Sequence, residues 1–283
     1  MFIAPMLPER QEEPFDDEGF LFEPMIDGRR LLVSVDRGRV RLFTRGGTDV
    51  TLQYPELHRI PLADATDAVL DGELACFATE TGMFAPEALA ERFRMRKPLQ
   101  IREAAMRRPV RFFAFDLLRY EGRDLRELPL ERRRALLATA LEDRGAYVKL
   151  PAVEGCGRAF FDAMAGKPFK GMAAKRKSSR YVEGRAADWR KILRYRYANA
   201  AIVGYRKHSF GWLLEVDRQA AGVLESGVPA PYKQAFGGVS RTIETGEDRE
   251  YVYVRPAIEA RVRFLGRLPD GRLRKPEFLG FAE

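Results

Sequence analysis

Cysteine and histidine are nearly absent, with two of each among 283 residues. Cys76 and Cys156 are too few and too far apart for a disulfide framework or a cysteine-built zinc site, and two histidines leave little room for a histidine-built metal site. No apolar run is long enough to span a bilayer, and Met1–Pro5 has no cationic segment before a long apolar one. We therefore expect a cytoplasmic protein with no membrane partner.

Positive charge is plentiful by comparison. Lysine and arginine number 49 against 41 acidic residues, which gives a formal net charge of +8. With 46% hydrophobic and 32% charged residues, the chain can bury a real core in one large domain or two unequal ones, and its composition is not that of a disordered chain. The charge favours a polyanionic partner such as nucleic acid or an acidic membrane, but it says nothing about the fold.

The excess charge is concentrated in residues 167–196, which contain eleven basic residues and two acidic ones. Such a run is usually a solvated face. Here it is interleaved with aromatic residues: Phe169, Tyr181, Trp189, Tyr195 and Tyr197. We interpret this texture as favouring a surface that follows a phosphate backbone.

Hydrophobic patterns predict an α+β domain over residues 1–195. A hairpin is expected where residues 36–39 separate two β-rich runs. The predicted strands are Leu31–Val35, Val40–Thr44, Ala68–Phe77, Val110–Leu118, Gly171–Lys175 and Trp189–Tyr195. The predicted helices are Ala85–Met95, Pro129–Leu141 and Arg158–Ala165; the second has leucines on one side of an arginine-rich surface.

A second domain is predicted over residues 196–283, with its boundary near Tyr195–Tyr197. Strands are expected at 200–206, 211–216, 222–225 and 251–264, with a short helix near 230–236. About five short strands and one helix in under ninety residues suit a small Greek-key barrel of the OB type.

Six short segments carry charged or aromatic groups suited to phosphate chemistry. The first, residues 22–30, contains Asp27-Gly28, which alone is an ordinary turn dipeptide. The others are residues 44–47 (Thr-Arg-Gly-Gly), 70–74 (Leu-Asp-Gly-Glu-Leu), 113–118 (Phe-Ala-Phe-Asp-Leu-Leu), 170–176 (Lys-Gly-Met-Ala-Ala-Lys-Arg) and 188–192 (Asp-Trp-Arg-Lys-Ile). Taken singly, Glu73 could be a surface carboxylate, Phe115 a core residue, and Lys175 and Lys191 solvated lysines. It is their order along the chain that indicates a function.

This ordered series resembles the covalent nucleotidyltransferases, and specifically the compact bacterial ATP-dependent DNA ligases related to the end-joining ligases. The resemblance extends to residues 271–278, which look like the end of their OB domain. It implies an adenylation (nucleotidyltransferase) domain with antiparallel sheets, followed by an OB-fold β-barrel. It also implies a monomer that acts on nicked double-stranded DNA in repair or recombination, nucleoid-associated when on DNA.

The resemblance implies a reaction in three steps with ATP as AMP donor and Mg²⁺ or another divalent cation. A lysine of the enzyme attacks the α-phosphate of ATP, AMP passes to the 5′-phosphate of a nick, and the 3′-hydroxyl then displaces AMP. Matched residue by residue, the nucleophilic lysine falls on Met25 and the motif arginine on Arg30. Glu23 would contact the nucleotide, and Arg45 would lie near the nucleotide or the nick phosphate.

The remaining motif positions complete the implied site. Glu73 would hold the ribose or a metal ion, and position 170 would be a second metal position. Phe115 would stack on adenine, a contact that needs a flat apolar face. Lys175 and Lys191 would neutralise phosphate charge in the transition state.

Three departures from the family pattern bear on activity. Met25 has a thioether, which cannot form a phosphoramidate, so the first step should fail. Lys170 stands where the family has a glutamate that helps hold Mg²⁺, and a lysine would repel the ion. Leu193 replaces a second lysine found in many relatives, and the basic motif that often closes the OB domain is missing.

Three explanations of these departures compete. In the first, a ligase-like protein has lost self-adenylylation through Met25. In the second, the protein is a non-catalytic binder of nicks or duplex DNA derived from a ligase. In the third, Lys170 supplies a relocated amine. RNA ligation or capping share the first motif, but the short second domain ending in Arg274–Phe278 argues against them.

Overall fold

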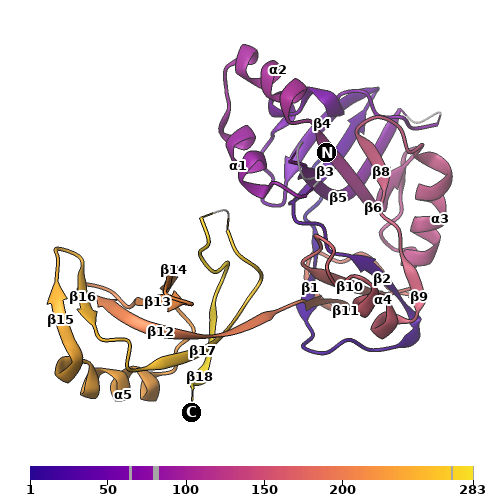
Figure 1. The fold of residues 1–283 in the computed structure, drawn as a ribbon. Coiled ribbons are helices and arrows are strands. Elements are labelled where there is room, and N and C mark those ends of the chain that lie inside the picture. Colours follow the sequence, from indigo (N-terminus) through magenta and orange to yellow (C-terminus); the bar gives the residue numbers. More distant parts are fainter. Residues whose placement is uncertain (64–65, 79–82, 269, 283) are drawn as a thin grey trace. The chain divides into compact units, whose positions relative to one another are not determined.

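The computed structural model describes residues 1–63, 66–78, 83–268 and 270–282. It divides into two compact units, Met1–Leu193 and Arg194–Glu283, a division two residues before the expected boundary. Strands predominate and helices are few in both units, so the predicted α+β class is confirmed (Figure 1). Within the described ranges, no helix is long and apolar enough to cross a membrane.

The first sheet of the N-terminal unit, sheet B, runs in the order β4-β3-β5-β6-β7, with β8 added parallel to β6. Its strands are β3 (Arg29–Asp36), β4 (Arg39–Thr44), β5 (Asp67–Cys76), β6 (Val110–Tyr120), β7 (Arg123–Asp124) and β8 (Tyr147–Lys149). The predicted hairpin joins β3 to β4, and its two central residues, Arg37 and Gly38, have positive φ values of 48° and 76°. Two positive φ values are typical of the tight hairpin turns that match strand twist.

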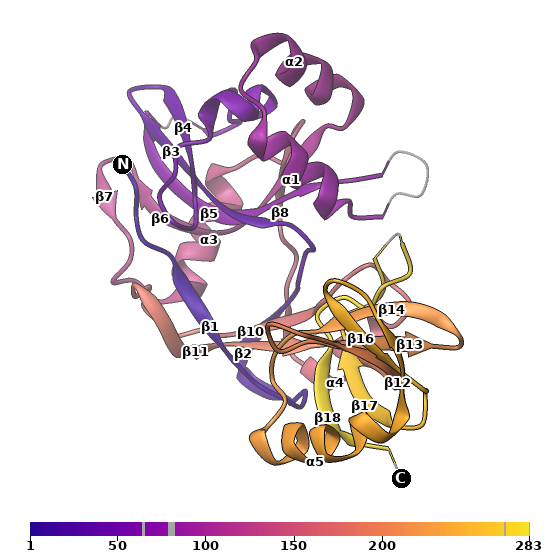
Figure 2. The same cartoon turned by 90° about the vertical axis from the view of Figure 1, so that its left-hand side faces the viewer.

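The second sheet, sheet A, combines strands from both ends of this unit, in the order β1-β11-β10-β2-β9. Its strands are β1 (Met6–Arg10), β2 (Asp17–Pro24), β9 (Val153–Gly155), β10 (Gly171–Arg176) and β11 (Gly184–Leu193). β1 and β11 are parallel, and the other neighbours are antiparallel. Figure 2 shows β1, β2, β10 and β11 gathered into a layer distinct from β3–β6.

Four layers result, because both sheets are buried on both faces. On sheet B, Leu31 and Val33 of β3 pack toward α1 (Pro86–Arg94) and α3 (Leu130–Ala140), whereas Leu32 packs toward sheet A. α4 (Gly157–Ala163) covers the far face of sheet A, against Phe22. Each large apolar side chain removed from water in this way contributes roughly 1.5–3 kcal/mol.

The C-terminal unit is an antiparallel sheet wrapped around Trp212, with α5 (Ala230–Ser240) at one side. Its strands are β12 (Arg196–Arg206), β13 (Trp212–Val216), β14 (Gln219–Leu224), β15 (Glu244–Glu247), β16 (Tyr251–Val254), β17 (Glu259–Phe264) and β18 (Glu277–Phe281). The prediction of one strand over 251–264 is wrong. The segment forms two strands, β16 and β17, separated around Pro256, which cannot donate to a strand ladder.

Some elements of the N-terminal unit were not predicted from the sequence. They include β1, β2 and α2 (Pro98–Arg107), together with the short turns η1 (Thr51–Gln53) and η2 (Pro55–Leu57). In the C-terminal unit, η3 (Arg241–Ile243), β15 and β18 were likewise missed. The case of β2 shows why such elements are missed. Its residues Phe20–Phe22 are buried on both faces, so the sequence lacks the alternation of apolar and polar residues that indicates a strand.

Candidate functional site

The segment Met25–Gly28 crosses from sheet A to sheet B, between the end of β2 and the start of β3. The Met25 N–H donates to the Gly171 carbonyl at 2.9 Å, and the Lys170 N–H donates to the Met25 carbonyl at 3.1 Å. These two bonds place positions 25 and 170 opposite each other. A Cβ at Gly28 would lie 2.1 Å from the Leu74 carbonyl oxygen, so this crossing requires glycine.

We expect Gly28→Ala to destabilise the N-terminal unit by about 1–3 kcal/mol, because the backbone must move to admit the methyl group. Gly46→Ala is the matched control, since a Cβ there meets nothing within 4 Å. Thermal unfolding of the two variants measures the difference. Equal melting temperatures would show that the crossing tolerates a side chain.

Two adjoining cavities meet at this crossing and share four residues, Pro8, Met25, Arg30 and Glu73. The inner cavity is also lined by Glu23, Phe115, Leu150, Lys170, Lys175 and Trp189, and the outer one by Arg29, Arg45, Phe93, Arg185 and Lys191. The structure therefore brings together all nine positions that the sequence suggested, including position 170.

At the inner end, Lys175 and Glu23 form a buried ion pair. Lys175 Nζ lies 2.7 Å from Glu23 Oε2, and the Arg134 guanidinium binds the other carboxylate oxygen. Burial lowers the pKa of Lys175 to about 8, and the Glu23 carboxylate opposes the shift. Neither residue is solvated as its type would suggest, and both side chains are already engaged within the protein.

The Phe115 ring lines the same cavity, but it is largely enclosed. Lys175 Nζ lies 3.6 Å from the ring centroid and the Arg30 guanidinium carbon 4.5 Å from it, both as cation–π contacts. Trp189 meets the ring edge-on at a centroid separation of 6.2 Å. Trp189 is buried, and its Nε1 is without a hydrogen-bond partner in the described part of the chain.

Arg30 is held by Asp71, a residue whose importance was not recognised from the sequence. The guanidinium makes a bidentate ion pair with the fully buried Asp71 carboxylate, which also accepts a 2.5 Å hydrogen bond from the Tyr181 hydroxyl. Arg30 Nη2 donates to the Met6 carbonyl at 3.2 Å. Asp71 and Glu73 are two residues apart on β5 and therefore share one face of the strand. This spacing could have indicated from the sequence that Asp71 lies at the site together with Glu73.

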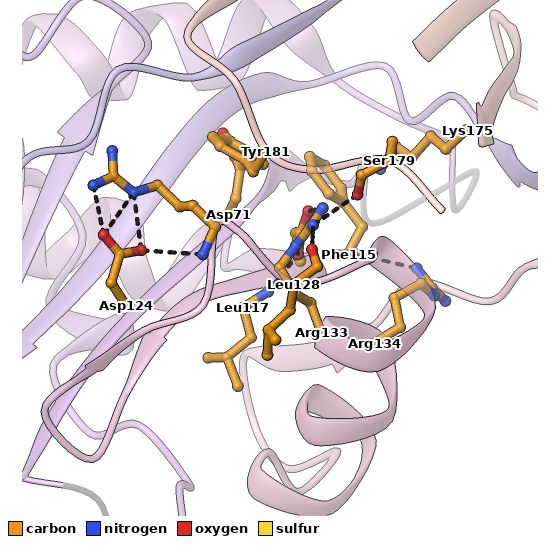
Figure 3. Close-up of polar contacts among 12 residues, drawn as sticks. Asp71, Phe115, Leu117, Asp124, Leu128, Arg133, Arg134, Lys175, Ser179 and Tyr181 are labelled. Atoms are coloured by element: carbon orange, nitrogen blue, oxygen red, sulfur yellow. Dashed lines mark hydrogen bonds and ion pairs between the residues drawn. The ribbon is translucent and has the colours of Figure 1, made fainter. Parts of the chain in front are cut away.

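A second buried pair supports the site from behind and corrects the interpretation of the 129–141 helix. Arg133 is fully buried, binds both carboxylate oxygens of Asp116 at 2.8 and 2.9 Å, and donates to the Ser179 carbonyl at 2.9 Å (Figure 3). Arg134 turns inward as well, donating to the Phe115 carbonyl at 3.2 Å. The arginines of this helix therefore do not all face solvent. Two of them point inward, because the buried carboxylates require cationic partners.

The expected metal position is occupied by a lysine whose ammonium group binds one of the nearby carboxylates. Lys170 Nζ lies 3.2 Å from Asp27 Oδ1, and Lys170 shares the inner cavity with Glu73. Burial raises the pKa of Glu73 to about 7, against the opposing charges of Lys170 and Arg30. No group of three acidic, histidine or cysteine side chains able to hold a metal is found among residues whose placement is described. The residues present therefore do not fit Mg²⁺.

The outer cavity differs from the inner one in its larger number of cations, although apolar residues such as Leu7 and Phe93 also line it. Arg45 and Arg185 are exposed at its margin and Lys191 is half-buried within it. The sequence of residues 167–196 predicts a surface that follows a phosphate backbone, and only part of this run is such an exposed basic surface. Trp189 and Tyr181 of that run are core residues, and several of its cations form ion pairs: Arg176–Asp188, Lys177–Glu154 and Arg180–Glu127.

Comparison with known proteins identifies close similarity along the whole chain. The family model described as ATP dependent DNA ligase domain matches residues 5–192. The SPbeta prophage-derived DNA ligase-like protein LigB of Bacillus subtilis is 30% identical over 280 residues, 98% of each protein. The multifunctional non-homologous end joining DNA repair protein LigD of Mycobacterium tuberculosis is 32% identical over 289 residues, 92% of this chain but 35% of LigD. The chain thus spans about a third of LigD.

A solved structure extends this similarity to three dimensions. The chain matches mycobacterial DNA ligase D complexed with ATP and MES with a TM-score of 0.60 and 29% identity, covering 99% of this chain and 94% of that one. The likeness covers both units, so the expected fold class, an α+β domain followed by a small β domain, is confirmed.

Proposed function

The chain belongs to the family of ATP-dependent DNA ligase domains, and from this premise we propose that it binds an adenine nucleotide and nicked duplex DNA but cannot load AMP onto itself. The observation that carries the proposal is Met25, whose side chain lines both cavities at the point where they join. A thioether has no nitrogen to attack phosphorus, so the covalent step that defines the family has no nucleophile at this position.

The other amines of the inner cavity support this proposal, because both are engaged as cations. Lys170 is paired with Asp27, and Lys175 with Glu23. An amine held in such an ion pair would have to leave its carboxylate before it could attack phosphorus. This argues against Lys170 as a relocated nucleophile, although it lies opposite Met25.

The features needed for binding are retained. Arg30 is rigidly oriented by Asp71, and the outer cavity offers Arg45 and Lys191 to phosphate groups. The Phe115 and Trp189 side chains give the inner cavity an aromatic wall. An adenine nucleotide that extends across both cavities would use both sets of groups.

The reaction that remains open to such a protein is the last step of the family cycle. Sealing of a nick whose 5′-phosphate already carries AMP needs no enzyme nucleophile, because the 3′-hydroxyl attacks and AMP leaves. Arg30, Arg45 and Lys191 would then orient the two ends and balance the charge on the reacting phosphate. A protein that binds nicks without sealing them is the alternative, and the lack of a fitting metal site favours it.

Incubation with ATP labelled at the α-phosphate, followed by peptide mapping, tests the central claim. We expect no covalent label at any residue, together with measurable binding of ATP and of nicked DNA that weakens steeply with salt. Label on Lys170 or Lys175 would overturn the proposal and identify a replacement nucleophile.

A pre-adenylylated nick then separates the two remaining functions. Sealing above the rate without protein supports the residual ligase, whereas nick binding without sealing supports the binding protein. DNA and RNA nicks compared in the same assay identify the nucleic acid. Failure to bind either nick contradicts both functions.

A further inference from the structure

Lys170 is held in one place by contacts on either side of it. Its N–H is bonded to the Met25 carbonyl, and its Nζ lies 3.2 Å from Asp27 Oδ1. Both side chains are mostly buried, with 19% of Lys170 and 11% of Asp27 exposed. Gly171 follows with a φ of 147° and no room for a Cβ, which fixes the course of the chain into β10. The ammonium group therefore has a defined position in the inner cavity.

The carboxylates around this ammonium are those that a divalent cation would need. Asp27 binds it directly, and Glu73 lines the same cavity and feels its charge. Asp71, the other acid on that face of β5, is occupied by Arg30 and Tyr181. A divalent cation at this position would compete with Lys170 for the Asp27 carboxylate, and the positive charge of Lys170 would repel it at close range.

We propose that the Lys170 ammonium takes the place of the divalent cation, so that the cavities bind the metal-free form of an adenine nucleotide through its phosphates. The proposal rests on the proposed function only for the identity of the ligand. Although it is paired with Asp27, the Lys170 ammonium has further N–H groups that can donate to phosphate oxygens, and it requires no oxygen ligands from the protein. Lys191 and Arg45 add charge in the adjoining cavity.

This arrangement reverses the usual effect of magnesium. Mg²⁺ in solution neutralises part of the charge on ATP, and the complexed nucleotide would be drawn less strongly to fixed cations. Free ATP should therefore bind at least as tightly as its magnesium complex. Restoring an acid at position 170 should reverse this preference, because two carboxylates and the nucleotide would then require a cation.

Calorimetric titration of the full chain with ATP, in EDTA and in millimolar Mg²⁺, tests the proposal. We expect equal or up to about tenfold tighter binding in EDTA, as an order-of-magnitude estimate for loss of ligand charge. Lys170→Glu should bind ATP about tenfold more weakly than the parent in EDTA and recover with Mg²⁺. Lys167→Glu, the same charge reversal at a nearby exposed lysine, should behave as the parent in both conditions.

Direct metal binding provides a second measurement that does not depend on the nucleotide. Electron paramagnetic resonance with Mn²⁺ should show no bound ion in the parent and a new site in Lys170→Glu, with circular dichroism checking that each variant is folded. ATP binding by the parent that requires Mg²⁺ would overturn the inference and leave the proposed function intact. Absence of ATP binding in both conditions would overturn both.

Discussion

Replacing Met25 by lysine and Lys170 by glutamate together is expected to produce a protein that self-adenylylates at least about a hundredfold above the parent, since loss of one essential catalytic group commonly costs that much or more. The double change provides a nitrogen at the junction of the two cavities and frees the acids around position 170. Covalent transfer of label from the α-phosphate of ATP, in the presence of Mg²⁺, measures the gain.

The single changes show how the two positions interact. Met25→Lys alone would place a second ammonium opposite Lys170, at the point where backbone hydrogen bonds join the two segments of the chain. Repulsion between the two like charges should lower reactivity, so we expect less labelling than in the double variant. Lys170→Glu alone should remain unlabelled. Met25→Lys combined with Lys167→Glu is the matched control and should resemble Met25→Lys alone. If Met25→Lys alone were fully active, Lys170 would have no inhibitory effect.

The largest loss of stability is expected at the buried pair behind the site. Arg133→Met should destabilise the N-terminal unit by about 3–5 kcal/mol, because it leaves the fully buried Asp116 carboxylate without its bidentate partner. The Ser179 and Leu128 carbonyls would also lose a donor. Denaturant unfolding monitored by tryptophan fluorescence measures the change in the free energy of unfolding.

Arg132→Met is the matched control, since Arg132 is the exposed neighbour on the same helix and should shift stability by less than about 0.5 kcal/mol. Removing both charges with Arg133→Met and Asp116→Leu should recover much of the loss, because a buried pair can be replaced by apolar groups of similar volume. A single variant as stable as the control would mean that water reaches Asp116.

Elements with a clear period could be predicted from the sequence. The β3–β4 hairpin has β-rich runs on both sides of Arg37-Gly38, and α1 has a proline at its start and helical spacing. The positions around the cavities were also found, because their order along the chain matched a family. Neither result required knowledge of which strands become neighbours.

The partners of these residues could not be predicted in the same way. Lys175 lies within a basic run that looks solvated, yet it is buried against Glu23, which lies more than 150 residues earlier in the chain. Arg133 sits among other arginines, and only the packing of α3 against β6 distinguishes it from them. Burial decides these assignments, and burial follows from strand pairings that are distant in sequence.

The pairing of β1 with β11 has a consequence for how the chain is made. Strand Met6–Arg10 finds its parallel neighbour only after Gly184–Leu193 has left the ribosome, on the order of ten seconds or more later at usual synthesis rates. Until then β1 has no neighbouring strand to hold the Met6 carbonyl next to Arg30. Sheet A is also incomplete, so its apolar residues are not fully covered. We expect nascent chains that stop before residue 184 to bind chaperones and to be sensitive to protease, with protection gained abruptly once β11 is complete.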